Sequence, residues 1–266
     1  MAKPLVSDEL WALVVPLLPP EPPKPKGGRP RVPDRSCLTG IIFFLKSGIQ
    51  WELLPQEMGC GSGMTCWRRL RDWQAAGVWD VAPRAPRSPR GRRPDRLEPG
   101  ESGQCQHSSQ KGGDLTGPNP TDRGKPGTKR HILTERGGLP LAKLRTAANR
   151  HDSVVFEDLL DAVPPVRQPN GRRRKRPAKL HADKAYDIPR CRQALHRRHI
   201  GIRIARKGID SSARLGRYRW VVERTLAWVN RYRRLTVRYE RRADIHDAFL
   251  TLGCALICFN ALQQGF

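Results

Sequence analysis

The sequence predicts an α/β domain preceded by a small all-α region, and three observations support this. From residue 128 onward, short strand-like runs alternate with segments of helical periodicity, which is typical of a sheet covered by helices. The first 80 residues contain three helical patterns and no strand pattern. Between these two regions, residues 83–110 are rich in proline and arginine and show neither periodicity.

The all-α region contains three predicted helices. The first spans residues 5–18, the second residues 34–47, and the third runs from a Thr65 cap to Gly77. In each segment the apolar side chains recur at helical spacing, so each helix has one face for a core. Residues 1–80 are therefore expected to form a helical domain, and the arginines of its third helix indicate that this domain binds DNA.

The third helix carries Arg68, Arg69 and Arg71 on the face opposite its apolar side. Three short helices with an arginine-bearing third helix resemble a helix-turn-helix DNA reader. A plain helical bundle with solvated arginines fits the same spacing. The formal net charge of +25 favours the first interpretation and makes these three arginines the predicted DNA contacts.

The proline- and arginine-rich segment is predicted to be a disordered or irregular linker over residues 81–127. Within residues 83–110 the apolar side chains are limited to Ala85, Leu97 and Cys105. So little apolar surface cannot offset the conformational entropy lost on ordering. The sheet of the following domain, residues 128–266, is consequently expected to lack its first strand.

The α/β domain begins with a hairpin around the turn at residues 135–138. The strands expected in this domain are 128–134, 139–146, 179–183 and 200–205, and the helices are 154–163, 189–198, 217–232 and 245–262. The last helix is apolar nearly all round and should be buried.

Charge and composition narrow the function. Lys and Arg number 50 against 25 acidic residues, an excess that a fold does not need and that favours a nucleic-acid partner. The sequence shows no apolar run approaching about 20 residues and no signal peptide, so we expect a cytoplasmic, nucleoid-associated protein without a membrane partner. The seven scattered cysteines include no Cys-x-x-Cys pair, which favours reduced thiols over structural zinc.

Two carboxylates stand out in these basic surroundings. Asp183 ends a short strand, and Glu223 lies on the apolar side of a helix, where it should be partly buried. Two-metal phosphoryl transfer needs carboxylates that converge from different elements in this way. The alternatives are a turn or helix-capping role for Asp183, and for Glu223 an ion pair with Arg219 or Arg224.

Several motifs together resemble the insertion-sequence DDE transposases of the family founded on insertion sequence five, of actinobacterial type. The motifs lie at residues 10–19, 40–55, 111–124, 151–153, 181–187 and 220–225. The resemblance covers about residues 5–80 and 111–262. Each motif is weak alone, and the combination is specific.

The resemblance implies an RNase H-like catalytic domain that uses Mg²⁺, or alternatively Mn²⁺, to cut and join the element's ends. The implied partner is double-stranded DNA, both the inverted repeats and the target, bound by a homodimer. Asp183 matches the second acid of the family and Glu223 the third; both are the predicted metal ligands and catalytic residues. Arg219 matches an arginine of the same motif, and it and Arg224 are predicted DNA contacts. Gly216 and Asn230 depart from the tyrosine and lysine of relatives.

The first acid of the family has no clear counterpart. Relatives place it on the first strand of the sheet, shortly before the motif at residues 111–124. Glu101, Asp114 and Asp122 are the nearby carboxylates, and none has a strand pattern around it. With suitable codons, residues 97–111 read one nucleotide later encode a strand with a central aspartate, whose codon straddles those of Gly103 and Gln104. Two compensating frameshifts are therefore a hypothesis for the missing acid.

These observations leave two functions open. The first is a transposase, intact or decayed. The second is a transposase-derived DNA-binding protein without catalysis, and the two differ in the first acid. An unrelated RNA-binding protein is disfavoured because the sequence has no aromatic-rich RNA-binding signature.

Overall fold

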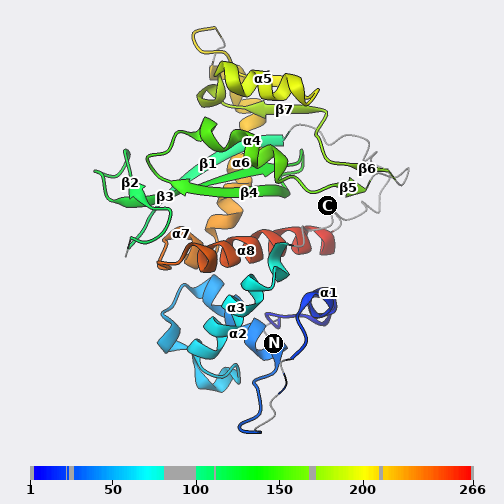
Figure 1. Cartoon of the computed structure of the whole chain (residues 1–266), viewed down its shortest axis with the longest axis vertical. Helices are drawn as coiled ribbons and strands as arrows, with labels where there is room; N and C mark the ends of the chain where they lie inside the picture. Colours follow the sequence, from blue (N-terminus) through cyan, green and yellow to red (C-terminus); the bar gives the residue numbers. More distant parts are fainter. Residues whose placement is uncertain are drawn as a thin grey trace.

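The structure is a computed structural model that describes residues 3–21, 23, 27–80, 100–110, 112–167, 172–209 and 212–264. Of residues 80, 100–106, 167 and 212–219 only the backbone is described. The N-terminal helices form one end of the molecule, a long C-terminal helix crosses its middle, and a mixed sheet with further helices forms the other end (Figure 1).

The N-terminal helices are α1 (Asp8–Val14), extended by the short η1 (Val15–Leu17), α2 (Asp34–Ser47) and α3 (Gly63–Ala75). The short 3₁₀ turns η2 (Trp51–Leu53), η3 (Gln56–Met58) and η4 (Val78–Asp80) complete this region.

The ends of these helices follow local capping rules. Ser7 accepts a hydrogen bond from the Leu10 amide at 3.2 Å, and Gly48 ends α2 in the left-handed conformation. The predicted start of the third helix at Thr65 is wrong. Ser62 caps it instead and accepts from the Thr65 amide at 3.1 Å, so α3 begins earlier, at Gly63.

The main sheet has the strand order β2-β3-β1-β7-β8, and β4 pairs with β3 on its other side. Its strands are β1 (Gly100–Ser108), β2 (Gly117–Pro118), β3 (Pro126–Thr134), β4 (Pro140–Ala147), β7 (Lys179–Ala182) and β8 (Gly201–Ile204). The predicted hairpin is confirmed as β3 and β4, which pair antiparallel. The short parallel strands β7 and β8 also match their prediction.

The prediction of a linker without structure is wrong for residues 100–108. They form β1, which pairs antiparallel with β3 over its whole length and parallel with β7. Thr128–Thr134 therefore has no open edge. The edges of β3 and β7 that face β1 carry backbone N–H and C=O groups that need hydrogen-bond partners. Residues 100–108 can supply these partners from their own backbone, whatever their side chains. Residues 81–99 of the predicted linker lie outside the described residues.

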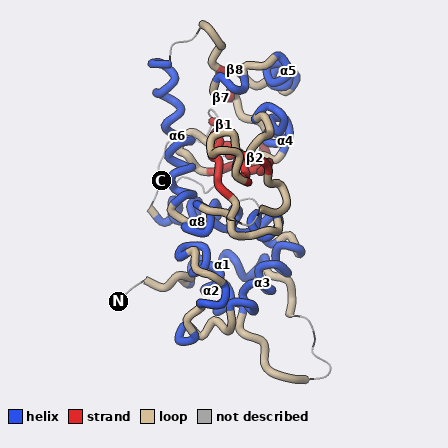
Figure 2. The backbone as a smooth tube through the Cα atoms, turned by 90° about the vertical axis from the view of Figure 1, so that its left-hand side faces the viewer, coloured by secondary structure: helices blue, strands red, loops and turns tan. Residues whose placement is uncertain are grey.

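Helices cover both faces of the sheet. Helices α4 (Phe156–Asp161) and α5 (Pro189–Arg197) lie on one face, and α6 (Ser212–Asn230) and α8 (Ala243–Gln263) lie on the other (Figure 2). The short turns η5 (Asp152–Val155) and η6 (Lys184–Tyr186) precede α4 and α5, and α7 (Arg233–Thr236) connects α6 to α8. Successive side chains of β3 point to opposite faces of the sheet and so enter two separate apolar cores. Ile132 packs in the core with α6 and α8, whereas Leu133 packs in the core with α4 and α5.

The N-terminal helices are not a separate helical domain with its own core. The apolar side chains of α1, α2 and α3 belong to the same buried cluster as those of α6 and α8. Residues 48–62 and two 3₁₀ turns separate α2 from α3, far more than the short turn of a helix-turn-helix. The prediction of helix-turn-helix spacing is therefore wrong for α2 and α3, and the helical region packs as one layer of a continuous helical core.

Helix α8 is long and apolar enough to cross a membrane by length and composition alone. Two thirds of its most apolar window, 67%, is buried by the surrounding chain. The predicted burial of this helix is confirmed, because it lies between the sheet and the N-terminal helices (Figure 1). Its apolar composition is explained by that position in the core.

The described cysteines agree with the expectation of reduced thiols. Cys37, Cys60, Cys66, Cys191, Cys254 and Cys258 are all free and buried.

Three fully buried histidines predict a pH-dependent stability. Burial lowers the pKa of His107 to about 3 and those of His131 and His246 to about 4; the charge of Arg130 adds to the shift at His107. The folded values lie below the unfolded value of about 6.5, so the unfolded chain binds more protons between them. Stability should fall as the pH drops from about 6.5 towards 4, by about 1.4 kcal/mol per pH unit for each histidine.

Urea unfolding at a series of pH values between neutral and 5 measures this loss. His246→Gln should make the pH dependence shallower by the share of one histidine. His196 is exposed on α5, and His196→Gln serves as the matched substitution outside the core. The pKa of Glu240 is lowered despite its burial, by His246 at 3.8 Å and by the hydrogen-bonded, positively charged Arg234, so this carboxylate stays ionised through the window. Equal pH profiles for the native chain and His246→Gln would contradict the prediction.

Candidate active site

Asp183 lies where the sequence predicts it, directly after strand β7. Its side chain accepts a hydrogen bond from the Ala185 amide at 2.9 Å and thereby caps the turn η6. The capping role foreseen as an alternative is thus present. Asp183 is half-buried and its backbone is still extended, so it continues the alternation of β7.

That alternation decides which face of the sheet Asp183 occupies. Leu180 and Ala182 belong to the core beneath α4 and α5. Asp183 is one residue further along the extended chain, so it lies on the opposite face, which α6 covers. The carboxylate position and the helix that carries Glu223 are therefore on the same side of the sheet.

Glu223 lies in the middle of α6, and its side chain is exposed. The expectation of partial burial is wrong, because the inward stripe of this helix is formed by Val222, Leu226 and Val229. Helix α6, which carries Glu223, packs across β1 and β3 (Figure 1). An exposed carboxylate there can meet a ligand without a large desolvation cost.

The residues after Glu223 fix α6 to the β3–β4 hairpin. Arg224 donates to the carbonyl oxygen of Gly137, and Thr225 Oγ1 donates to that of Gly138 at 2.5 Å. The Arg224 guanidinium lies 4.5 Å from the ring centroid of Trp220 and 4.7 Å from that of Trp228. These contacts hold the register of α6 against the sheet and so position Glu223.

The strand register brings one residue of β1 level with Asp183. The β1–β7 pairing aligns Gly100 with Leu180 and Ser102 with Ala182, so the next residues in line are Gly103 and Asp183. On its other side Gly103 pairs with Ile132, which faces the core under α6 and α8. A residue at position 103 therefore shares its sheet face and its level with Asp183. In this chain the position is a glycine.

The three carboxylates weighed as substitutes lie elsewhere. Glu101 is in β1 and aligns with His181, one step before position 103 on the same face, so the view that no strand surrounds it is wrong. Asp114 accepts from the Ala243 amide at the start of α8, at 3.2 Å. Asp122 pairs with Lys125 at 3.7 Å in the loop between β2 and β3. Those two lie beyond the end of β1 that pairs with Gly127, far from Asp183.

Asp183 and Glu223 are two carboxylates, whereas the metal chemistry of this kind of site uses three. Among the residues that the structure describes, no group of three His, Cys, Asp or Glu side chains is arranged to hold an ion. Position 103 offers no donor.

The predicted DNA contacts of α3 divide into two kinds. Arg69 is buried, forms an ion pair with Asp34 and donates to the carbonyl oxygen of Val32 at 3.2 Å. It ties α3 to the start of α2 and is withdrawn as a DNA contact. Arg68 is exposed, and Arg71 is half-exposed beside Asp72, so these two remain available at the surface.

The remaining predicted contacts lie on α6. The side chain of Arg219 and residue Gly216 lie in the part of α6 for which only the backbone is described. Asn230 accepts from Arg130 at 3.1 Å and links the end of α6 to β3. The asparagine that replaces the lysine of relatives thus takes part in a packing contact.

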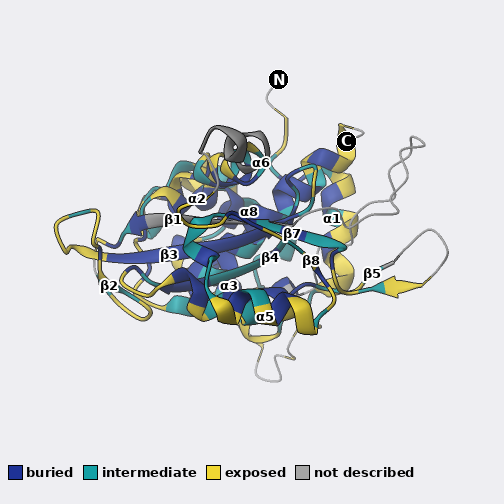
Figure 3. Ribbon diagram, turned by 90° about the horizontal axis from the view of Figure 1, so that it is seen from above, coloured by how far each residue is buried: buried dark blue, intermediate teal, exposed yellow. Residues whose placement is uncertain are grey.

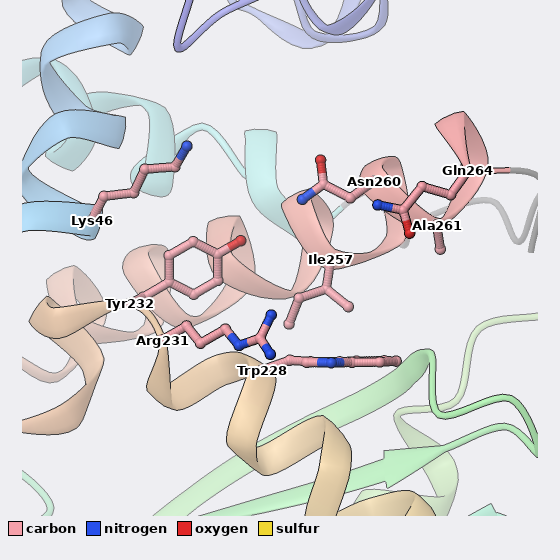
Figure 4. A pocket seen from close by; sticks show the side chains of 8 residues that line it. All are labelled: Lys46, Trp228, Arg231, Tyr232, Ile257, Asn260, Ala261 and Gln264. Atoms are coloured by element: carbon pink, nitrogen blue, oxygen red, sulfur yellow. The ribbon is translucent and has the colours of Figure 1, made fainter. Parts of the chain in front are cut away.

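A half-open cavity of about 430 Å³ lies between α2, the end of α6 and α8. Figure 4 shows Lys46, Arg231 and the rings of Trp228 and Tyr232 around it; Ile257, Asn260, Ala261 and Gln264 complete the lining. Among the lining residues there is no carboxylate, and neither Asp183 nor Glu223 contributes to this cavity.

Comparison with known proteins gives two family matches. Residues 6–82 match a family described as a putative transposase of the IS4/5 family, and residues 99–258 match the transposase DDE domain. The second match begins one residue before β1. The matched region and the structure thus both start the α/β domain well before residue 128.

Two proteins of Burkholderia cepacia are similar to this chain. A putative transposase for insertion sequence element IS402 is 48% identical over 171 residues, which are 64% of this chain and 81% of that protein. An uncharacterized 16.2 kDa protein of insertion element IS402 is 66% identical over 84 residues, which are 30% of this chain and 56% of that protein. The chain thus spans little more than half of the second relative.

Proposed function

This chain belongs to the DDE-domain transposases of insertion sequences, and we propose that it is a copy whose catalytic site has lost its first acid. The function inherited by descent is cleavage and strand transfer at the element's ends with divalent metal, Mg²⁺ or Mn²⁺. Asp183 and Glu223 are the proposed second and third acids. The observation that carries the proposal is the register that sets Gly103 beside Asp183.

The topology supports an RNase H-like assignment for residues 100–263. Three antiparallel strands, β4, β3 and β1, are followed in the sheet by two parallel strands, and the helix with Glu223 crosses the face on which Asp183 lies. We propose domain limits that differ from the sequence prediction: helical residues 3–80, packed on α8, and a catalytic domain that starts with β1.

The charge of the chain supports duplex DNA as the partner, both the inverted repeats and the target, bound by a homodimer. Arg68 and Arg71 are the proposed contacts of the helical region, and Arg219 and Arg224 those beside the site. Arg224 already donates to Gly137, so we expect it to act mainly by positioning α6. Because two carboxylates stand where chemistry of this kind needs three, strand transfer should be strongly impaired.

The test uses duplexes that carry the two ends of the element encoding this chain. The native chain, Asp183→Asn and Glu223→Gln should all bind these ends, and none should cleave them above background with Mg²⁺ or Mn²⁺. Gel-shift and cleavage assays on the same preparations measure both steps. If the native chain cleaves the ends and Asp183→Asn does not, the site is complete and the proposed loss is refuted. If the native chain does not bind DNA, the transposase function itself is absent from this copy.

A further inference from the structure

A small basic hairpin projects from the α/β domain. Strands β5 (Val166–Arg167) and β6 (Arg173–Arg174) pair only with each other and form a sheet separate from the main one. The hairpin extends beyond the body of the domain (Figures 1 and 3). Its descending arm, residues 172–176, consists of five consecutive cations.

The sequence on either side of this arm supplies no carboxylate. No Asp or Glu occurs between residues 162 and 182. Arg172, Arg173, Lys175 and Arg176 are exposed. Arg174 donates to the carbonyl oxygen of Arg176, and Arg176 to that of Arg198, both at 2.9 Å. A carbonyl oxygen has no net charge, so these two hydrogen bonds orient the guanidinium groups without neutralising their positive charge.

Cations on the neighbouring helix are paired with carboxylates. On α5 and the residue that follows it, Arg197 lies 2.9 Å from Glu157, and Arg198 lies 3.0 Å from Glu157 and 2.9 Å from Asp161. These cations have carboxylate partners within the fold. A dense run of like charges at the hairpin costs stability by self-repulsion unless an anionic partner is bound.

The shape of the arm favours duplex DNA as that partner. Adjacent residues of a strand point to opposite faces, so the cations of β6 are presented on both faces of the ribbon. The major groove of B-DNA admits a two-stranded ribbon and is flanked by phosphates on both sides. A flat anionic surface such as a membrane would meet only one face.

The arm is also held within reach of the candidate site. Pro177, at the end of the arm, is buried, and the chain then passes into β7 and Asp183. Arg174 and Asp183 are nine residues apart in sequence, which limits their separation to about 30 Å. One turn of B-DNA is about 34 Å long, so a single duplex at Asp183 can extend to the hairpin.

We propose that the β5–β6 hairpin is a DNA-binding arm whose cations at residues 172–176 contact the phosphates of a duplex held at the candidate site. This inference rests on the proposed function, because it assumes that DNA is the partner. The contact is independent of sequence, so it contributes affinity and register along the duplex.

The salt dependence of binding tests the arm. The variant Arg172→Ala, Arg173→Ala, Lys175→Ala removes three exposed cations outside the main sheet. Each lost phosphate contact flattens the slope of log K against log salt by about 0.9, so the slope should fall by about 2–3. Between 50 and 200 mM salt, the native chain should then lose about 40-fold more affinity than the variant. The full chain and a mixed-sequence duplex about three helical turns long serve for the titration.

Two matched variants separate charge from structure. Arg172→Lys, Arg173→Lys, Lys175→Arg keeps the charge and should keep the native slope. Lys125→Ala, Arg197→Ala, Arg242→Ala removes the same charge from three exposed cations that each have a carboxylate partner, and should change the slope by less than about 1.

The outcomes distinguish this proposal from the function on which it rests. A native chain with no affinity for the duplex overturns the proposed function and the arm together. Steep native binding with an unchanged slope in the alanine variant overturns the arm alone. An equal slope loss in both alanine triples also overturns it, since net charge would then be the cause. Binding of anionic phospholipid vesicles in place of the duplex would assign the arm to a membrane surface and reject it as a DNA contact.

Discussion

Replacing Gly103 with aspartate is expected to raise metal-dependent cleavage of the element's ends by at least about 100-fold, since loss of one group that stabilises a transition state commonly costs that much. The register of β1 places position 103 level with Asp183 and on the sheet face that α6 covers. An aspartate there would add a third carboxylate to Asp183 and Glu223. Initial cleavage rates of the native chain and Gly103→Asp with Mg²⁺ give the ratio.

A matched variant controls for the added negative charge. Gln104→Asp adds the same carboxylate one residue along β1, and successive strand positions lie on opposite faces of the sheet. It should give no gain in rate. Combining Gly103→Asp with Asp183→Asn should abolish the restored activity. Equal rates for Gly103→Asp and the native chain would contradict the register argument.

Glu101 offers the strongest alternative source of a third acid. It lies on the same face as position 103 and two residues before it, about 7 Å away along the strand. If the native chain cleaves DNA and Glu101→Gln abolishes that cleavage, Glu101 supplies the acid and Gly103 is not a lesion. Restoring the alternative reading frame over about residues 80–111 tests the proposed origin of the lesion independently.

Replacing Arg234 with alanine is expected to lower the free energy of unfolding by about 3–5 kcal/mol, the usual cost of breaking a buried ion pair. Arg234 Nε lies 2.7 Å from Glu240 Oε1, and both side chains are 4% exposed. The same guanidinium donates to the carbonyl oxygen of Ile49 and lies 5.2 Å from the ring centroid of Trp51. Arg234 therefore joins α7 to the end of α2. Its replacement by alanine leaves Glu240 as a buried carboxylate without this counter-charge.

Urea unfolding at neutral pH measures the loss, and the adjacent Arg233 provides the control. Arg233 is exposed, so Arg233→Ala should change stability by less than about 0.5 kcal/mol. Arg234→Lys keeps the charge but loses the planar fork that reaches Glu240 and Ile49 together, so it should restore only part of the loss. Similar stabilities for Arg233→Ala and Arg234→Ala would show that the ion pair contributes little.

Arg234 also explains why the helical region and the α/β domain form one unit. Its contacts, and the cluster shared by α1, α2, α3 and α8, fix the N-terminal helices against the C-terminal helix. If Arg68 and Arg71 contact DNA, their position relative to Asp183 is therefore set by a packed core. The proposed hairpin arm is anchored through β7 to the same sheet.

The sequence alone determined the features that depend on residues a few positions apart. Ser7 and Gly48 mark helix ends through their own backbone and side-chain chemistry. The turn at residues 135–138, the place of Asp183 after a short strand and the burial of α8 follow from local patterns in the same way. The transposase family was also evident from spaced motifs, and the comparisons confirm it.

Only the tertiary structure decided what depends on distant partners. Residues 100–108 carry no strand pattern, yet they form β1 because β3 and β7 both offer backbone hydrogen bonds along its edges. The sequence pattern predicts that Arg69 is exposed, yet its side chain is buried in an ion pair with Asp34 of another helix. Strand register and burial are properties of the assembled chain, because the groups that fix them meet only when segments far apart in sequence are packed together. For that reason the alignment of position 103 with Asp183, on which the proposal of a lost first acid rests, is seen only once β1 lies beside β7.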